Sequence, residues 1–222
     1  LSIRSGLIDR QHMAVTRSRL NKMPLLALLL WTAAAAGQLT QQTLPVTALG
    51  EALGVSVFLP PDYARNTDTR YPALYINDGQ DAGAVGLAEN LGRLYREKRI
   101  APVIVVAVPM LPDRIGTYGF SDRAAGISLP AATRFGPVGA SAHAYSEWLA
   151  LELVPEIDRQ FRTLRKPEAR TVLGWSLGAA SAFNIAWNYP EVFGRTGGFS
   201  PSFWLSREAN RPDTAIAPDM IA

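Results

Sequence analysis

The 222-residue sequence contains no cysteine and only two histidines, and charged residues make up 18% of it. Without cysteine, the chain has no disulfide framework, no thiolate metal site and no cysteine nucleophile. The low charged fraction argues against a disordered chain or a coiled coil. A hydrophobic fraction of 48% and a mean hydropathy of +0.04 are typical of a globular domain, and the length suits one such domain.

Positive charge is concentrated at the N-terminus. Residues 1–36 carry five basic side chains against the single acid Asp9. This segment therefore accounts for more than the whole net charge of +3, and residues 37–222 are slightly acidic. The isoelectric point of about 9.4 therefore reflects the basic residues of segment 1–36 and does not indicate a nucleic-acid partner.

Residues 23–36 read MPLLALLLWTAAAA and follow a basic stretch. A charged segment, a short apolar run and a small-residue end predict a signal peptide, and the run is too short to span a bilayer. We predict an N-terminal leader over 1–36 that contains a cleavable signal peptide at 23–36. Export to the periplasm or medium, with no stable membrane anchor after processing, follows from this prediction. A core helix or an uncleaved anchor is the alternative.

The remainder, 37–222, alternates strand-like and helix-like segments, which predicts an α/β fold with a mostly parallel central sheet flanked by helices. Residues 109–140, rich in Gly, Pro and Arg, predict a long surface loop. The expected strands span 53–59, 73–77, 102–108, 170–175 and 192–199, and the expected helices span 84–98, 144–161 and 177–189.

The pentapeptide Gly174-Trp175-Ser176-Leu177-Gly178 has the pattern G-x-S-x-G between an expected strand and an expected helix. In this context the pattern predicts a sharp turn that exposes the Ser176 hydroxyl above the sheet. The two glycines leave room for the turn. The helix that follows directs free N–H groups to the same place, and the Leu177 N–H is a candidate oxyanion donor. A chance pentapeptide is the alternative.

Four further segments accompany this pattern, in chain order: VFLPPDY (57–63), YPALYINDGQ (71–80), LVPEID with FRT (153–163) and SPSFW (200–204). Together they resemble the α/β-hydrolase esterases of the esterase D and enterochelin esterase type over about residues 50–205. The resemblance implies an α/β-hydrolase fold and a second oxyanion donor, the backbone N–H of Gln80. Asp78 is expected to tie the turn together. Candidate pocket walls, for which core packing is the alternative, are Trp175, Tyr118, Phe203 and Trp204.

The pattern breaks at the catalytic base. In this fold the acid and the histidine follow the serine, yet His12 and His143 both precede Ser176. His12 lies in the leader, and His143, at an expected helix start, is expected to be a surface or capping residue and not the base. We therefore expect 37–222 to be an incomplete esterase domain that lacks its C-terminal part, with the catalytic acid and histidine outside it. A degenerate relative without hydrolytic activity is the alternative.

These features predict an exported serine esterase that acts on a small-molecule ester through an acyl-enzyme on Ser176, with no metal and no organic cofactor. The alternatives are an acyltransferase, a non-catalytic binding module and a siderophore esterase. The siderophore esterase requires a cationic pocket, for which Arg114 and Arg123 are candidates. The ester itself and the oligomeric state are not indicated by the sequence.

Overall fold

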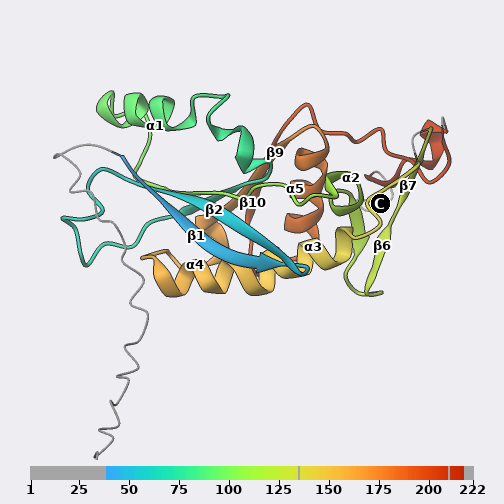
Figure 1. Cartoon of the computed structure of the whole chain (residues 1–222), viewed down its shortest axis with the longest axis horizontal. Helices are drawn as coiled ribbons and strands as arrows, with labels where there is room; N and C mark the ends of the chain where they lie inside the picture. Colours follow the sequence, from blue (N-terminus) through green and yellow to red (C-terminus); the bar gives the residue numbers. More distant parts are fainter. Residues whose placement is uncertain (1–38, 135, 210, 218–222) are drawn as a thin grey trace, which may run out of the picture. The chain divides into compact units, whose positions relative to one another are not determined.

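The computed structural model describes residues 39–134, 136–209 and 211–217 (Figure 1). The predicted leader and signal peptide lie outside these residues. A six-stranded sheet with the order β1-β2-β4-β3-β9-β10 forms the centre. Its strands are β1 (Thr40–Ala48), β2 (Glu51–Leu59), β3 (Ala73–Ile76), β4 (Ile104–Ala107), β9 (Arg170–Trp175) and β10 (Arg195–Phe199). The α-helices are α1 (Leu87–Arg96), α2 (Arg114–Thr117), α3 (Ala142–Trp148), α4 (Val154–Gln160) and α5 (Leu177–Asn188).

The sheet is mixed. Strands β4, β3, β9 and β10 are parallel to one another, whereas β2 is antiparallel to β4 and forms a hairpin with β1. The α/β prediction is confirmed, and every expected strand and helix has a counterpart. Strand β1 was not predicted, because it mixes polar and apolar residues. Only Leu44 and Ala48 of this strand are buried.

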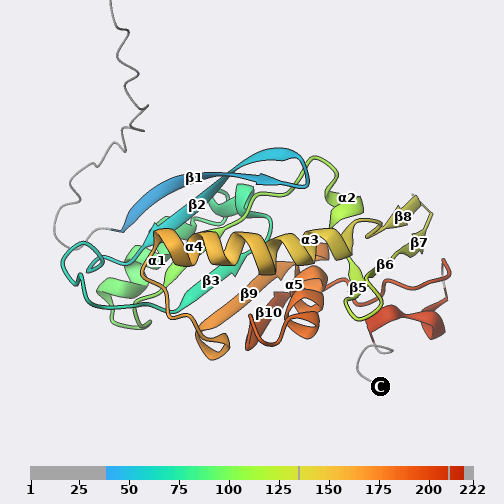
Figure 2. The same cartoon turned by 90° about the horizontal axis from the view of Figure 1, so that it is seen from below.

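Helices cover both faces of the sheet. Helix α1 lies on one face, while α3, α4 and α5 lie on the other (Figures 1 and 2). The larger cluster of buried side chains lies between the sheet and α3 to α5. A smaller one, which includes Leu91 of α1, lies on the opposite face. Strand β4 (IVVA) is buried along its whole length, as expected for a central parallel strand between two helical layers.

The expected helix over 144–161 is a rod of three segments. Five residues of π-helix, Leu149–Leu153, separate α3 from α4. Pro155 is the second residue of α4, and proline can neither donate an N–H to the residue four positions earlier nor fit its ring against that carbonyl. The wider turn accommodates the proline without ending the rod.

The segment 109–140 is not the surface loop that the composition predicted. It contains α2 and two short hairpins, formed by β5 (Phe120–Asp122) with β6 (Ile127–Leu129) and by β7 (Ala131–Thr133) with β8 (Gly136–Val138). Tyr118 and Phe120 are fully buried. The prediction was wrong because the glycines and prolines shape tight turns here, while the aromatic residues between them belong to the core.

Two 3₁₀ turns flank the central strands, η1 (Gly79–Ala82) and η3 (Pro167–Ala169), and a third, η4 (Pro212–Thr214), lies near the end of the described residues. No helix within the described ranges is long and apolar enough to cross a membrane.

Candidate active site

Ser176 lies on the bend between β9 and α5. Its backbone has φ +53° and ψ −122°, a conformation that non-glycine residues rarely adopt. The Ser176 N–H donates to the carbonyl of Phe199 at 2.9 Å, which fixes the bend against the end of β10. The residue is exposed. A strained, exposed serine between a strand and a helix is the geometry that the sequence pattern predicted.

Gly174 and Gly178 make this bend possible. A Cβ at Gly174 would lie 2.4 Å from backbone atoms of Gly178, closer than any real contact. A Cβ at Gly178 would lie 2.6 Å from a carboxylate oxygen of Asp78. A side chain is therefore excluded at both positions. At Gly174 it would fill the close contact between β9 and α5, and at Gly178 it would fill the close contact between α5 and the turn that follows β3.

The first turn of α5 leaves a backbone donor open beside Ser176. The N–H groups of Ala179 and Ala180 donate to the Ser176 carbonyl at 3.2 Å. The N–H of Leu177 precedes them, and within the described part of the chain no acceptor is paired with it. Open N–H groups at the start of a helix favour negative charge.

The turn after β3 supplies the other candidate donor, Gln80. Asp78 adopts a left-handed conformation (φ +59°), and a Cβ at Gly79 would lie 2.4 Å from the Ala107 backbone. These constraints bring the chain tightly over the end of β4. The Gln80 side chain accepts a hydrogen bond from the N–H of Met110 at 2.8 Å. Its own backbone N–H is paired with no acceptor among the described residues.

A buried hydrogen-bond network joins this turn to α5. Asn77 donates through Nδ2 to the carbonyl of Gly178 at 2.9 Å, and its Oδ1 accepts from the Tyr145 hydroxyl at 2.8 Å. The Tyr118 hydroxyl accepts from the Asp78 N–H at 3.1 Å. Burial raises the pKa of both tyrosines above the ordinary value, so the two hydroxyls stay protonated. The network fixes the turn relative to the bend that holds Ser176.

Asp78 is fully buried and pairs with Arg114 through two hydrogen bonds, of 2.7 and 2.8 Å. The bonds to Asp78 raise the pKa of Arg114. A two-pronged arginine–carboxylate pair fixes both groups in orientation. Here it also neutralises a carboxylate that lies next to the first turn of α5, where unbalanced negative charge would oppose an oxyanion. Asp78 thus ties the turn, as predicted.

The Ser176 hydroxyl lies 3.5 Å from the hydroxyl of Ser202, which is almost fully buried. The Ser202 N–H donates to the Ser176 carbonyl at 3.1 Å. His143 contacts neither serine: its backbone N–H donates to Ser128 Oγ, and its Nδ1 is buried without a partner among the described residues. The structure therefore offers no hydrogen bond between His143 and Ser176.

The four candidate wall residues have different surroundings. Tyr118 is completely buried, so the core-packing alternative holds for it. Trp175 is half-buried and packs against the apolar cluster on the α1 face. The Phe203 ring meets Phe183 edge to face at 5.3 Å. Trp204 has 68% of its surface exposed, which leaves it as the most accessible of the four.

The two arginines considered for a siderophore pocket are both engaged within the chain. Arg114 is held by Asp78. Arg123 donates to the Asn188 carbonyl and to Glu191, and it lies over the Tyr189 ring at 4.2 Å. Neither is therefore an unpaired cation. The described residues also contain no group of three or more acidic or histidine side chains placed to hold a metal ion.

Sequence reasoning missed several residues that support this site. Asn77 and Ser202 stood in recognised segments, and Tyr145 stood in an expected helix, but none of the three was given a role. An asparagine directly before Asp78-Gly79, at the end of a buried strand, was the available signal for Asn77. For Tyr145, no sequence signal links it to a residue 68 positions away.

The fold and the bend define an α/β-hydrolase architecture. The sequence model of the family described as "Putative esterase" matches residues 46–217, and the chain belongs to this family. An uncharacterized protein YbbA of Bacillus subtilis is 25% identical over 157 residues, which are 69% of this chain and 58% of the relative. An endo-1,4-beta-xylanase/feruloyl esterase of Xylanibacter ruminicola is 27% identical over 188 residues, which are 79% of this chain and 23% of the relative.

Among solved structures, the enterobactin esterase FES of Shigella flexneri aligns with a TM-score of 0.57 and 18% identity. The alignment covers 78% of this chain and 40% of that one. This likeness shows the fold. The chain spans little more than half the length of the two Bacillus subtilis relatives that it matches.

Proposed function

We propose that the protein is a serine-dependent carboxylic-ester hydrolase in which Ser176 forms the acyl-enzyme. The observation that carries the proposal is the strained, exposed Ser176 on a bend whose two glycines cannot be replaced without a clash. Membership in an esterase family supports it. Strain of this kind at a serine is retained where the bend serves a function.

In the proposed reaction, Ser176 Oγ attacks the ester carbonyl carbon, and the carbonyl oxygen becomes an oxyanion. The open N–H groups of Leu177 and Gln80 are assigned as its donors. Removal of one such donor typically costs about 3 kcal/mol of transition-state stabilisation. The C–O bond to the alcohol then breaks, the alcohol leaves with a proton, and water later releases the acid and restores the Ser176 hydroxyl.

The hydroxyl proton passes to a general base during the attack. In this fold the base is a histidine that follows the nucleophile in the chain. His143, the sole histidine among the described residues, precedes Ser176 and makes no hydrogen bond to it, so no role in proton transfer is assigned to His143.

Labelling with a fluorophosphonate tests the proposal. The protein is expressed from its complete reading frame, treated with the probe and digested, and the modified peptide is identified by mass spectrometry. We expect the label on Ser176 and its loss in Ser176→Ala. Ser141→Ala is the matched control, because the Ser141 side chain makes no cap hydrogen bond at the start of α3. Label on another serine, or label that survives Ser176→Ala, contradicts the assignment.

Hydrolysis assays with p-nitrophenyl acetate and a ferulate ester test the activity itself. A feruloyl esterase is among the relatives, which makes ferulate esters the first natural type of substrate to try. We expect turnover that disappears in Ser176→Ala. Export remains a prediction based on residues 23–36. It is tested by N-terminal sequencing of the protein recovered from a fractionated culture.

A further inference from the structure

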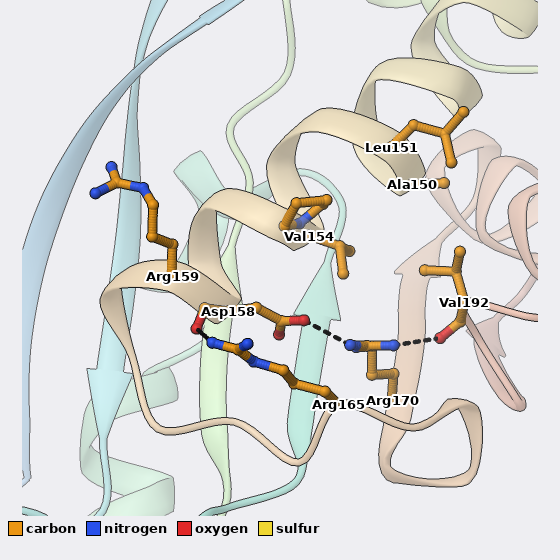
Figure 3. A pocket seen from close by; sticks show the side chains of 9 residues that line it. Ala150, Leu151, Val154, Asp158, Arg159, Arg165, Arg170 and Val192 are labelled. Atoms are coloured by element: carbon orange, nitrogen blue, oxygen red, sulfur yellow. Dashed lines mark hydrogen bonds and ion pairs between the residues drawn. The ribbon is translucent and has the colours of Figure 1, made fainter.

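Figure 3 shows a cavity of about 460 Å³ whose lining includes Arg170, at the other end of strand β9 from Ser176. Arg170 is the first residue of β9 and lines this cavity, whereas Ser176 follows the last residue of the strand. The cavity is formed by the π-helical segment Leu149–Leu153 (η2) and α4, the segment after α4, the start of β9 and the segment after α5. It therefore shares no residue with the candidate active site.

The polar side of the cavity holds more hydrogen-bond donors than acceptors. Asp158 is fully engaged: one carboxylate oxygen accepts from Thr163, the other accepts from Arg170 at 2.6 Å, and its carbonyl accepts from Arg165. Arg170 is 93% buried, yet its Nε has no partner among the described residues. Its remaining contact, to the Val192 carbonyl, is long at 3.4 Å.

The Tyr75 hydroxyl, which is not part of the lining of the cavity, is a second buried donor without a partner among the described residues. Tyr75 is completely buried. The charges of Asp158 and Arg170 both act on it, while burial is the main cause of its raised pKa. Buried donors without acceptors are rare in folded proteins and call for an oxygen from water or from a ligand.

The opposite side of the cavity is apolar. Leu151, Val154 and Val192 line it above the guanidinium of Arg170 (Figure 3). Leu151 keeps 45% of its surface exposed, although it belongs to a helical rod that is otherwise anchored in the core. Arg159 also lines the cavity, but its guanidinium points away from Arg170 (Figure 3). It pairs with Glu156. The charged groups that remain are Arg165, Arg170 and Asp158.

We propose that this cavity binds a small amphiphilic carboxylate, with its anionic head at Arg165 and Arg170 and its hydrocarbon body against Leu151, Val154 and Val192. Arg170 pairs with the Asp158 carboxylate, whereas Arg165 donates only to the Asp158 backbone carbonyl, so an added anion finds guanidinium donors there. An apolar wall with a few convergent polar groups is the usual composition of a small-molecule site, and the volume lies in the usual range. The proposal does not depend on the function of Ser176.

Calorimetric titration of the purified protein with sodium octanoate tests this proposal. Acetate supplies the same head without the hydrocarbon body, and octylammonium supplies the body with the opposite charge. We expect octanoate to bind at least about tenfold more tightly than either, because each lacks one of the two complementary parts.

Two variants locate the binding. Arg165→Gln and Leu151→Asp change exposed residues, and each is expected to weaken octanoate binding about tenfold or more. Arg96→Gln, an exposed arginine of α1 on the other face of the sheet, is the matched control and leaves the affinity unchanged. Arg170 is not replaced, because it holds the partly buried Asp158. Circular dichroism confirms that each variant is folded.

Equal binding of octanoate and acetate overturns the proposal, as does undetectable octanoate binding. It is equally overturned if Arg96→Gln weakens binding as much as Arg165→Gln, because the interaction would then be unspecific surface attraction. Retention of binding in both Leu151→Asp and Arg165→Gln places the ligand elsewhere and has the same consequence.

Discussion

At the scale of single residues, the shape of the site follows from a few backbone positions that tolerate one conformation. Ser176 holds a left-handed φ between β9 and α5, and Asp78 does the same after β3. Both are anchored by hydrogen bonds to neighbouring elements. Each of the two residues therefore carries strain that the surrounding structure offsets.

Replacement of Ser176 by glycine relieves this strain. Because a non-glycine residue in such a conformation costs roughly 1–3 kcal/mol, we expect Ser176→Gly to raise the free energy of unfolding by about 1 kcal/mol. Urea denaturation measures the change. Ser141→Gly is the control, since Ser141 has φ −111° and gains nothing from glycine. A loss of stability in Ser176→Gly equal to that in the control disproves strain at the bend.

The pair of Asp78 and Arg114 makes a second residue-scale prediction. Arg114→Gln leaves a buried carboxylate without its cation, which is costly even though the arginine is a quarter exposed. We expect a loss of about 2 kcal/mol in unfolding free energy, with slower labelling of Ser176 by a fluorophosphonate. Arg93→Gln removes the surface pair with Glu97 and is expected to cost less than about 0.5 kcal/mol. Similar losses in the two variants speak against a special role for Arg114.

At the scale of elements, the sequence predicted those strands and junctions that have a distinctive local pattern of residues. Continuous β-branched runs predicted β4, and the small residues around Ser176 predicted the junction of β9 and α5. Strand β1 escaped prediction because a half-exposed hairpin strand of mixed polarity has no distinctive pattern. The hairpins within 109–140 escaped because glycine and proline mark turns without showing what lies between them.

The candidate site likewise divides into residues that a local motif predicts and residue pairs that no local motif predicts. Ser176, Leu177 and Asp78 could be predicted, since each belongs to a local motif. The contact between Tyr145 and Asn77 joins residues 68 positions apart, and the contact between Arg114 and Asp78 joins residues 36 apart. Such pairs arise from the packing of α2 and α3 around the end of the sheet, which a single sequence does not encode as a pattern.

The junction of β9 and α5 makes a prediction about an element. A methyl group at Gly174 would meet the Gly178 backbone, which cannot yield as a flexible side chain would. We expect Gly174→Ala to cost about 2 kcal/mol of stability and to abolish labelling of Ser176, because α5 must shift. Thermal and urea unfolding measure the cost. Gly83→Ala, where nothing lies within 4 Å and φ is −67°, is the control and should be neutral. Retained labelling in Gly174→Ala contradicts the close-approach argument.

At the scale of the whole molecule, buried phenols control the response to alkali. Burial raises the pKa of Tyr75, Tyr118 and Tyr145 above 10 in the folded protein. Below pH 10 neither state ionises these groups and their contribution to stability is complete. Above pH 10 the unfolded chain releases protons that the folded chain retains, so stability falls by up to about 1.4 kcal/mol per pH unit for each tyrosine.

We therefore expect steep, cooperative alkaline unfolding, with tyrosinate absorbance appearing together with the loss of the circular dichroism signal. Spectrophotometric titration measures both in one sample. The variant Tyr63→Phe removes a tyrosine that is only half-buried, and as the internal comparison it should leave the midpoint of the transition in place. Gradual titration of all tyrosines near pH 10, with the fold intact, contradicts the expectation.

The mixed sheet also has a consequence for the order of assembly. Strands β1 and β2 pair across a tight turn at Leu49 and Gly50, whereas β3 must find β9 across nearly a hundred residues, with Ala73 opposite Arg170. Short-range pairings close early because little chain entropy is lost. The backbone amides of the β1–β2 hairpin should therefore become protected from pulsed hydrogen exchange before those of β3 and β9 at the centre of the sheet. In the newly made chain, the bend at Ser176, which follows β9, should form late.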